Sequence, residues 1–227
     1  MRPSLPVVLS LNAGYVDTAG FLALAGLFTA HVTGNFVTFG ATMVFGTTGA
    51  LPKLLALPVF CAVVLLTRLL RFQLIQRQFP VMRTMLGLKL ALLIVAGALA
   101  IHFGPFSDGG TLPAIVTGMT FVCAMAIQNA LHRVHLGSAP PTTLMTGTTT
   151  QIMLDLADLL HGVPPAQTAA AKGRLAKMCA NVAAFALGCG AGAVLFYLAG
   201  MWCFVIPPVI GLLSFFAHTA TPEGDAP

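Results

Sequence analysis

Eight apolar stretches run along the chain, separated by short turns in which most of the charged residues fall. They cover residues 5–27, 34–47, 51–71, 84–103, 112–131, 144–160, 177–198 and 201–217. The hydrocarbon core of a bilayer is about 30 Å thick, and a helix needs about 20 apolar residues to cross it. Six stretches have this length or come close to it. The pattern therefore predicts an all-α integral membrane protein with about six transmembrane helices.

Composition agrees with a membrane protein and leaves no room for a soluble domain. Only 7% of the 227 residues are charged and 57% are hydrophobic, whereas a soluble domain carries about 25% charged residues. We expect one membrane domain over residues 1–227, with a polar tail at 218–227. The net charge of +5 is interpreted as an orientation signal, because Lys and Arg collect in cytoplasmic loops. We expect no nucleic-acid partner.

The cysteines and histidines give no support for a metal or a cofactor. The five cysteines lie apart in apolar segments, with no CxxC or Cys/His spacing, and no HExxH motif occurs. Zinc sites need such spacings. We therefore expect neither metal nor cofactor and interpret the cysteines as small buried hydrophobic residues.

The stretches 34–47 and 144–160 differ from the other six. Both are short and rich in Thr and Gly, and the second contains two aspartates, so both are poorly suited to face lipid. They also occupy matching places, since Thr33-Gly34 opens the first and Thr146-Gly147 opens the second. The order of one long, one short and two long helices therefore predicts an internal repeat, with copies at about 5–103 and 112–217.

The positions of the basic residues decide between two topologies. If the two short segments are re-entrant or broken helices that do not cross, a cytoplasmic N-terminus places most basic side chains at the cytoplasmic face. These are Arg2, Arg68, Arg71, Arg77, Arg83, Arg133, Lys172, Arg174 and Lys177, with Lys89 snorkelling to the same face and Lys53 outside. Eight transmembrane segments, the alternative, would split this set. The re-entrant model is favoured, and it inverts the two halves relative to each other and makes both termini cytoplasmic.

Inverted repeats with broken helices are typical of transporters and channels, whose solute site lies near the bilayer midplane. In the first half the candidate site residues are Asp17, His31, Thr33, Gly34 and Asn35. Thr33 is placed to cap the helix that Asn35 opens, and the free N–H groups of that turn would attract an anion or a polar group. Asp17 is costly inside a membrane. It could bind a proton, a cation or a solute, or could simply accept hydrogen bonds from His31, Thr33 or Asn129.

The second half offers matching candidates of neutral chemistry. They are Gln128, Asn129, Thr146, Gly147 and Thr148, whose amides and hydroxyls can donate and accept hydrogen bonds. Two alternatives remain: Thr and Gly could serve close helix packing, and the amides could join helices to one another.

Three further sets of residues lead to alternative functions. Asp155 and Asp158 need basic partners at the cytoplasmic face, where Arg133 or Arg174 could form a salt bridge or a gate with them. Together with His132, His135 and His161 they are the only cluster that could support an intramembrane enzyme acting on a lipid or isoprenoid. Small residues recur at Ala184, Gly188 and Gly192. Such a stripe permits close helix contact, within the chain or in a homodimer, and would suit a non-catalytic assembly subunit.

Two pairs of motifs resemble the signature of the YoaK family of bacterial multi-pass inner-membrane proteins. The first half contains Gly14-Tyr15-Val16-Asp17-Thr18-Ala19-Gly20-Phe21 and Phe28-Thr29-Ala30-His31-Val32-Thr33-Gly34-Asn35. The second half contains Ala126-Ile127-Gln128-Asn129-Ala130 and Thr143-Leu144-Met145-Thr146-Gly147. Ile127 stands where the family usually has a glycine. The resemblance implies a multi-pass protein of the bacterial inner membrane and, beyond a suspicion of transport in some members, adds little about function.

The sequence thus favours a small-solute transporter or channel over an enzyme. Its partners would be membrane lipid and a small anion or polar solute, with proton coupling as an option that Asp17 offers. The solute's identity, the coupling ion and the choice between channel and carrier stay open at this level.

Overall fold

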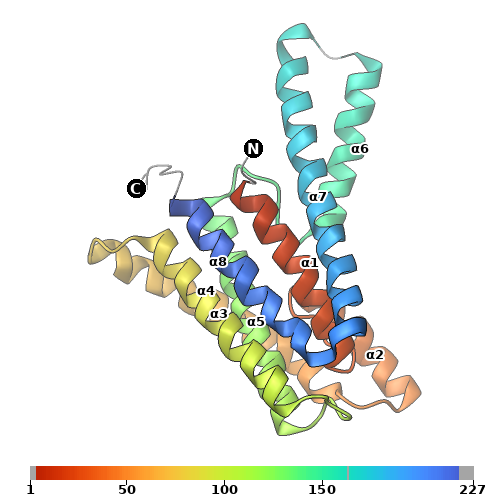
Figure 1. The fold of residues 1–227 in the computed structure, drawn as a ribbon. Coiled ribbons are helices and arrows are strands. Elements are labelled where there is room, and N and C mark those ends of the chain that lie inside the picture. The colour runs from red at the N-terminus through yellow and green to blue at the C-terminus, as the bar shows by residue number, and fades with distance from the viewer. Residues whose placement is uncertain (1–3, 163, 220–227) are drawn as a thin grey trace.

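The computed structural model describes residues 4–162 and 164–219, which form helices with no β-strand in these ranges (Figure 1). The long helices are α1 (Leu5–Ala23), α3 (Ala50–Gln76), α4 (Val81–Phe103), α5 (Leu112–His135) and α7 (Pro165–Ala199), which continues through the 3-10 turn η2 (Gly200–Val205) into α8 (Ile206–Thr219). Three helices are shorter: α8, which has 14 residues, α2 (Asn35–Phe45), preceded by the 3-10 turn η1 (Val32–Gly34), and α6 (Met145–His161). The expected tail from 218 falls almost entirely outside the described residues.

The long helices are the membrane-spanning part of the fold. α1, α3, α4 and α5 are each long and apolar enough to cross a bilayer, and so is the stretch from α7 to α8. α2 has 11 residues, which is about 16 Å of helix and half of what a crossing needs. The predicted all-α membrane fold is therefore confirmed.

The two halves of the chain interlock as an inverted repeat. Within each half the helices come in the same order, α1 to α4 and then α5 to α8. The third helix of each half packs on the first helix of the other, as α7 does on α1 and α3 on α5, while the last helices, α4 and α8, pack on each other. α2 extends from one end of the bundle and α6 from the opposite end (Figure 1).

The first short segment returns to the end of the bundle that it left. Gly49, just before α3, and Gly109, just before α5, both lie against Ala25, just after α1. α1 therefore ends where α3 and α5 begin. The chain between Ala25 and Gly49 turns back into the bundle and α2 then leads out again, as expected of a re-entrant segment.

Basic residues gather at the opposite end, called here the basic end. The last turns of α3 and α5 and the first turn of α4 all lie there, and the Arg83 guanidinium stacks on the Phe215 ring of α8 at 5.4 Å. The charge asymmetry used to predict the topology is thus present in the fold. Lys89 is a correction: it does not snorkel but is 1% exposed, and its Nζ donates to Gln128 Oε1 at 2.5 Å. Lys53 lies at the other end, as expected, but buried.

α7 is too long to fit within a bilayer. Its 35 residues correspond to about 52 Å of helix, whereas the hydrocarbon core is about 30 Å thick. Its first part and α6 form a hairpin that extends beyond the neighbouring helices at the basic end (Figure 1). We conclude that the tip of this hairpin lies outside the hydrocarbon core.

The small-residue stripe on α7 is used inside the monomer. Gly188 and Gly192 meet the α1 backbone at Leu11, Tyr15 and Ala19, so closely that neither position has room for a Cβ. Together with Ala184 they are buried. Of the two uses that the sequence left open, close contact within the chain or in a homodimer, these contacts show the first.

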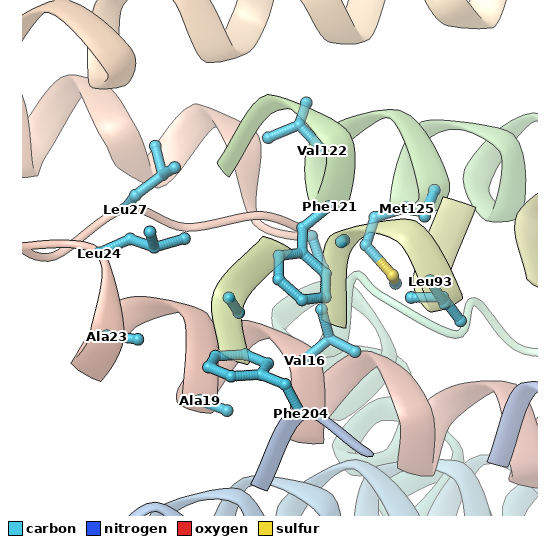
Figure 2. Close-up of a cluster of buried hydrophobic side chains, with 14 of the residues drawn as sticks. Val16, Ala19, Ala23, Leu24, Leu27, Leu93, Phe121, Val122, Met125 and Phe204 are labelled. Carbon is cyan, nitrogen blue, oxygen red and sulfur yellow. The ribbon is translucent and has the colours of Figure 1, made fainter. Parts of the chain in front are cut away.

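The hydrophobic core lies where both halves contribute side chains. Val16 and Ala19 of α1 face Phe121 and Met125 of α5, and Phe204 of η2 closes the cluster (Figure 2). The ring centroids of Phe121 and Phe204 are 5.1 Å apart. Because α1 is surrounded on several sides, its polar residues are positioned within protein and not in lipid.

Candidate functional site

Asp17 on α1 holds the first re-entrant segment in place. The residue is 4% exposed, and its Oδ1 accepts hydrogen bonds from the backbone N–H groups of Thr29 at 2.7 Å and Ala30 at 2.8 Å. Its Oδ2 lies 2.8 Å from His31 Nδ1. Irregular backbone at membrane depth is tolerated only when its polar groups are satisfied. Asp17 supplies those acceptors, and the N–H groups offset the cost of burying the carboxylate.

Asn35, the first residue of α2, fixes the same segment from its other side. Its Oδ1 accepts from the N–H of Phe28 at 2.9 Å, and its Nδ2 donates to the Phe28 carbonyl at 2.8 Å. The His31 ring meets the Phe185 ring of α7 edge-on at 5.4 Å. The His31 side chain is 32% exposed and that of Asp17 only 5%. His31 therefore connects the buried carboxylate with the surface.

The second half repeats this arrangement with amides. The Asn129 side chain accepts from Thr143 Oγ1 at 2.7 Å. Gln128, fully buried, donates from Nε2 to Thr142 Oγ1 at 3.1 Å and to the Leu9 carbonyl at 3.0 Å. The segment before α6 is thus tied to α5 in the way that the segment before α2 is tied to α1. The second cluster also contains a basic group, because Lys89 Nζ donates to Gln128 Oε1, whereas the candidate residues predicted for the second half are all neutral.

The two polar clusters lie at different levels along α1. One is centred on Asp17, and the other reaches α1 through Gln128 at Leu9. Eight residues of helix separate Leu9 and Asp17, which is about 12 Å. Between them lies Asn12, fully buried, with neither end of its amide hydrogen bonded within the described chain. A buried amide without partners is rare and costs about 1–3 kcal/mol for each unpaired group.

Five of the predicted site residues lie outside these clusters, among them Gly34, the last residue of η1. Thr33 is exposed within η1 and caps no helix, because α2 begins at Asn35 and its N-cap residue is Gly34. Thr146 and Gly147 are exposed in the first turn of α6, which starts at Met145. The Thr148 hydroxyl is buried, but it donates to the carbonyl of Leu144 on its own helix. The predicted Thr33 cap is therefore corrected, and the polar role passes to Thr29, Thr142 and Thr143.

A cavity of about 350 Å³ lies between α3 and α5 near the basic end. We call it the α3–α5 crevice. Asn129 reaches its wall, and most of the remaining wall is apolar. It is lined by Phe60, Val64, Thr67, Arg68, Arg71, Met85, Asn129, Ala130, Leu131, Arg133, Val134, His135 and Leu144. Small-molecule sites typically measure about 300–1,000 Å³, so the crevice has room for a small ligand.

The two aspartates of α6 differ in their surroundings: Asp155 is buried in an ion pair, and Asp158 is exposed. Arg174 donates from Nε and Nη2 to the Asp155 carboxylate at 2.7 Å each, and Gln151 adds a third bond. The bonds from Arg174 hold the pKa of Asp155 below its usual range. This confirms the predicted salt bridge with Arg174. Arg133 instead lines the crevice, and Asp158 is exposed. Among the described residues, no His, Cys, Asp and Glu side chains gather as a metal site would require.

Sequence reasoning missed several polar residues in this region. Asn12 was passed over because it occurs singly in an apolar run, and Thr142 because only its neighbour Thr143 belongs to a recognised motif. Lys89 was interpreted only as a snorkelling side chain. Arg68 and Arg71 were interpreted only as orientation signals. One signal could have identified Thr142 and Thr143: they follow the Gln128-Asn129 step at the spacing at which Ala30 and His31 follow Val16 and Asp17.

Comparison with known proteins gives a family but no activity. A family model described as a protein of unknown function, DUF1275, matches residues 5–217. No curated protein and no solved structure matches the chain.

Proposed function

The chain belongs to the DUF1275 family, whose function is unknown, and we propose that it is a membrane carrier for a small anionic or polar solute. In this proposal the solute reaches the region between the two re-entrant segments through the α3–α5 crevice. We favour a carrier over a channel because the α3–α5 interface encloses a cavity, whereas the equivalent α7–α1 interface is closed by backbone contacts.

The observation that carries the proposal is a difference between two interfaces that the repeat relates. α3 on α5 and α7 on α1 are equivalent pairs in the inverted fold. α7 on α1 is closed by backbone contacts at Gly14, Gly188 and Gly192, whereas α3 and α5 enclose the crevice. Carriers built from inverted repeats rock one repeat against the other around a central site. An open interface opposite a closed one is the arrangement expected of one state of such a cycle.

The polar groups along α1 also support a solute path. Asn129 belongs both to the crevice wall and to the second re-entrant cluster. Beyond it lie Gln128, the unpaired amide of Asn12 and finally Asp17. A polar solute that moves along this line would meet amide groups first and a carboxylate last. Buried polar and ionisable residues inside a membrane are characteristic of such pathways.

The Asp17–His31 pair offers a route for proton coupling. Nδ1 of His31 and Oδ2 of Asp17 are 2.8 Å apart, and a proton bound by the pair would be shared across this contact. His31 is the more exposed partner, at 32% against 5% for Asp17, so the pair has one side outside the protein interior. We propose that protonation loosens the hold of Asp17 on the first re-entrant segment and so couples proton uptake to its movement.

The proposal is tested by uptake into proteoliposomes made of phosphatidylcholine. The probes are two permanent anions of different size, methanesulfonate and hexanesulfonate, and the neutral solute glycerol. We expect at least one probe to enter faster than into protein-free vesicles. Asn129→Leu, which replaces the amide on the crevice wall by an apolar side chain of similar shape, should lower the rate at least tenfold. Asp17→Asn should remove the acceleration that an inward proton gradient gives.

Asp108→Asn is the matched control, because it makes the same chemical change in a loop at the end opposite the crevice, where Asp108 caps the N–H of Gly110. It should transport like the wild type. Uptake of all three probes at the rate of protein-free vesicles would overturn the proposal, as would full activity of Asn129→Leu.

A further inference from the structure

The α3–α5 crevice carries positive charge that the fold does not neutralise. Arg68 and Arg71 of α3 and Arg133 of α5 line it, and no acidic side chain does. Within the described chain the ion pairs join Asp17 to His31 and Asp155 to Arg174, and none involves these three arginines. Like charges around one cavity repel one another. Arg68 and Arg133 are exposed, whereas Arg71 is half-buried.

Arg71 shows that this charge is partly desolvated. Its Nε is buried and has no hydrogen-bond partner in the described part of the chain. Buried N–H groups of an arginine are rarely left without an acceptor. Arg68 stacks its guanidinium 4.8 Å from the centre of the Phe72 ring, which orients the group but supplies no negative charge. An anion at this place would therefore satisfy both an open hydrogen-bonding group and an uncompensated charge.

The rest of the wall requires a different chemistry. Phe60 and Val64 from α3, Leu131 and Val134 from α5, and Leu144 before α6 present apolar surface. A small hydrated anion would leave this surface uncovered. A ligand with an apolar chain would cover this surface. The favourable free energy is about 25 cal/mol for each Å² of apolar surface removed from water.

We propose that the crevice binds an amphipathic anion, with its charged head group on Arg68, Arg71 and Arg133 and its apolar chain against the crevice wall. This deepens the proposed function by naming the class of solute, and in that sense rests on it. Two sources supply such a ligand: an anionic phospholipid of the surrounding bilayer, or a water-soluble organic anion that carries a short chain. Basic pockets between membrane helices are known to hold lipid head groups.

Binding is measured by calorimetry with the full chain in phosphatidylcholine nanodiscs, with empty nanodiscs as the blank. The probe is octanesulfonate, which is anionic at every working pH. Three compounds serve as comparisons: sulfate has no apolar chain, octanol has no charge, and octyltrimethylammonium carries the opposite charge. We expect octanesulfonate to bind at least tenfold more tightly than any of these. From butane- to octanesulfonate the affinity should rise by up to about fourfold for each CH₂ that the cavity covers.

The triple variant Arg68→Gln, Arg71→Gln, Arg133→Gln should weaken octanesulfonate binding at least tenfold. Its matched control is Arg77→Gln, Lys172→Gln, Lys177→Gln, which removes the same charge from exposed positions at the same end and should bind like the wild type. Val64→Trp keeps all three arginines and fills the cavity, and it should also bind at least tenfold more weakly. The chain-length series needs no variant and so does not depend on how well these variants fold.

Nanodiscs that contain phosphatidylglycerol distinguish the two sources. A tenfold loss of octanesulfonate affinity in them assigns the crevice to lipid, and unchanged affinity assigns it to a soluble anion. The inference is overturned if sulfate binds as tightly as octanesulfonate, or if the triple variant binds like its control. Binding without uptake would contradict the carrier and not the ligand class, whereas uptake of glycerol without sulfonate binding would contradict the ligand class alone.

Discussion

Replacing Gly188 by alanine should separate the two helices that pack most closely in the fold. A Cβ at this position would lie 2.1 Å from the Leu11 carbonyl oxygen and 2.9 Å from the Tyr15 nitrogen. An ordinary carbon to oxygen contact is about 3.3–3.6 Å, so the backbones of α1 and α7 must move apart by about 1 Å. Neither neighbour can rotate away, because both are backbone atoms.

The cost follows from that displacement. A radial gap of about 0.5–1 Å forfeits about a quarter to a half of each dispersion contact across an interface, and overpacking in cores typically costs about 1–3 kcal/mol. We expect Gly188→Ala to lose about 2–3 kcal/mol. For a chain of this size that corresponds to a fall of about 4–12 °C in Tm.

Gly190→Ala is the control, two residues along the same helix. No atom lies within 4 Å of a Cβ placed there, and alanine in place of glycine favours a helix by up to about 1 kcal/mol. Its Tm should stay level or rise slightly. The assay is thermal unfolding of purified protein in detergent, followed by far-UV circular dichroism at several protein concentrations. Equal Tm values for the two variants would refute the packing argument. An effect on Gly188→Ala that disappears on dilution would show that the stripe joins two copies.

Three further outcomes follow from the polar contacts. Asp17→Ala should expose the first re-entrant segment to proteolysis and cost about 2–5 kcal/mol, because two buried N–H groups lose their acceptor, whereas Asp17→Asn keeps one and should cost less. Gln128→Leu should lower Tm more than Lys89→Met. The glutamine variant removes the hydrogen bonds to Lys89, Thr142 and the Leu9 carbonyl, whereas the lysine variant removes only the bond to Gln128. The hydrogen-exchange protection factors of the α6–α7 hairpin, which are corrected for the intrinsic pH dependence of exchange, should be equal at neutral pH and at about pH 5. They should fall below the ordinary aspartate pKa of about 3.9.

The sign of the last prediction follows from Asp155. Its pKa is lower in the fold than in the unfolded chain because Arg174 binds the carboxylate, so the stabilisation is complete above the unfolded pKa and is lost as the pH falls through the folded one. Asp155→Asn should show the loosened hairpin at every pH. Protection factors of the hairpin that already fall between pH 7 and 5 would contradict this reasoning. Equal proteolysis of Asp17→Ala and Asp17→Asn would contradict the prediction for the first re-entrant segment.

Hydropathy and charge placement were enough to predict the helices and the inversion of the halves, because both depend on the bilayer as solvent. The spacing of Asp17, His31 and Asn35 also predicted the first polar cluster. The details of capping were not predictable. Whether Thr33 or Asn35 fixes the turn depends on where the re-entrant backbone meets α1, and that is set by contacts between segments.

Lys89 and the three crevice arginines show a second limit. A single lysine in an apolar run is compatible with snorkelling until the position of Gln128, on another helix, is known. Arg68, Arg71 and Arg133 look alike as orientation signals, and only the packing of α3 on α5 brings them around one cavity.

The interlocked order of the helices has a consequence for synthesis. α1 is synthesised before α7, and the glycines of α7 that cover it follow about 170 residues later, which is about 10–30 s of translation at about 5–20 residues per second. During that interval Asp17 and Asn12 lie on a helix whose main partner does not yet exist. Neither half can complete its own interior, so a nascent chain that stops after α4 should be a substrate for membrane proteases. Because each half buries its interior only against the other, chains that lack the second half should be removed by proteolysis while chains that contain both halves persist.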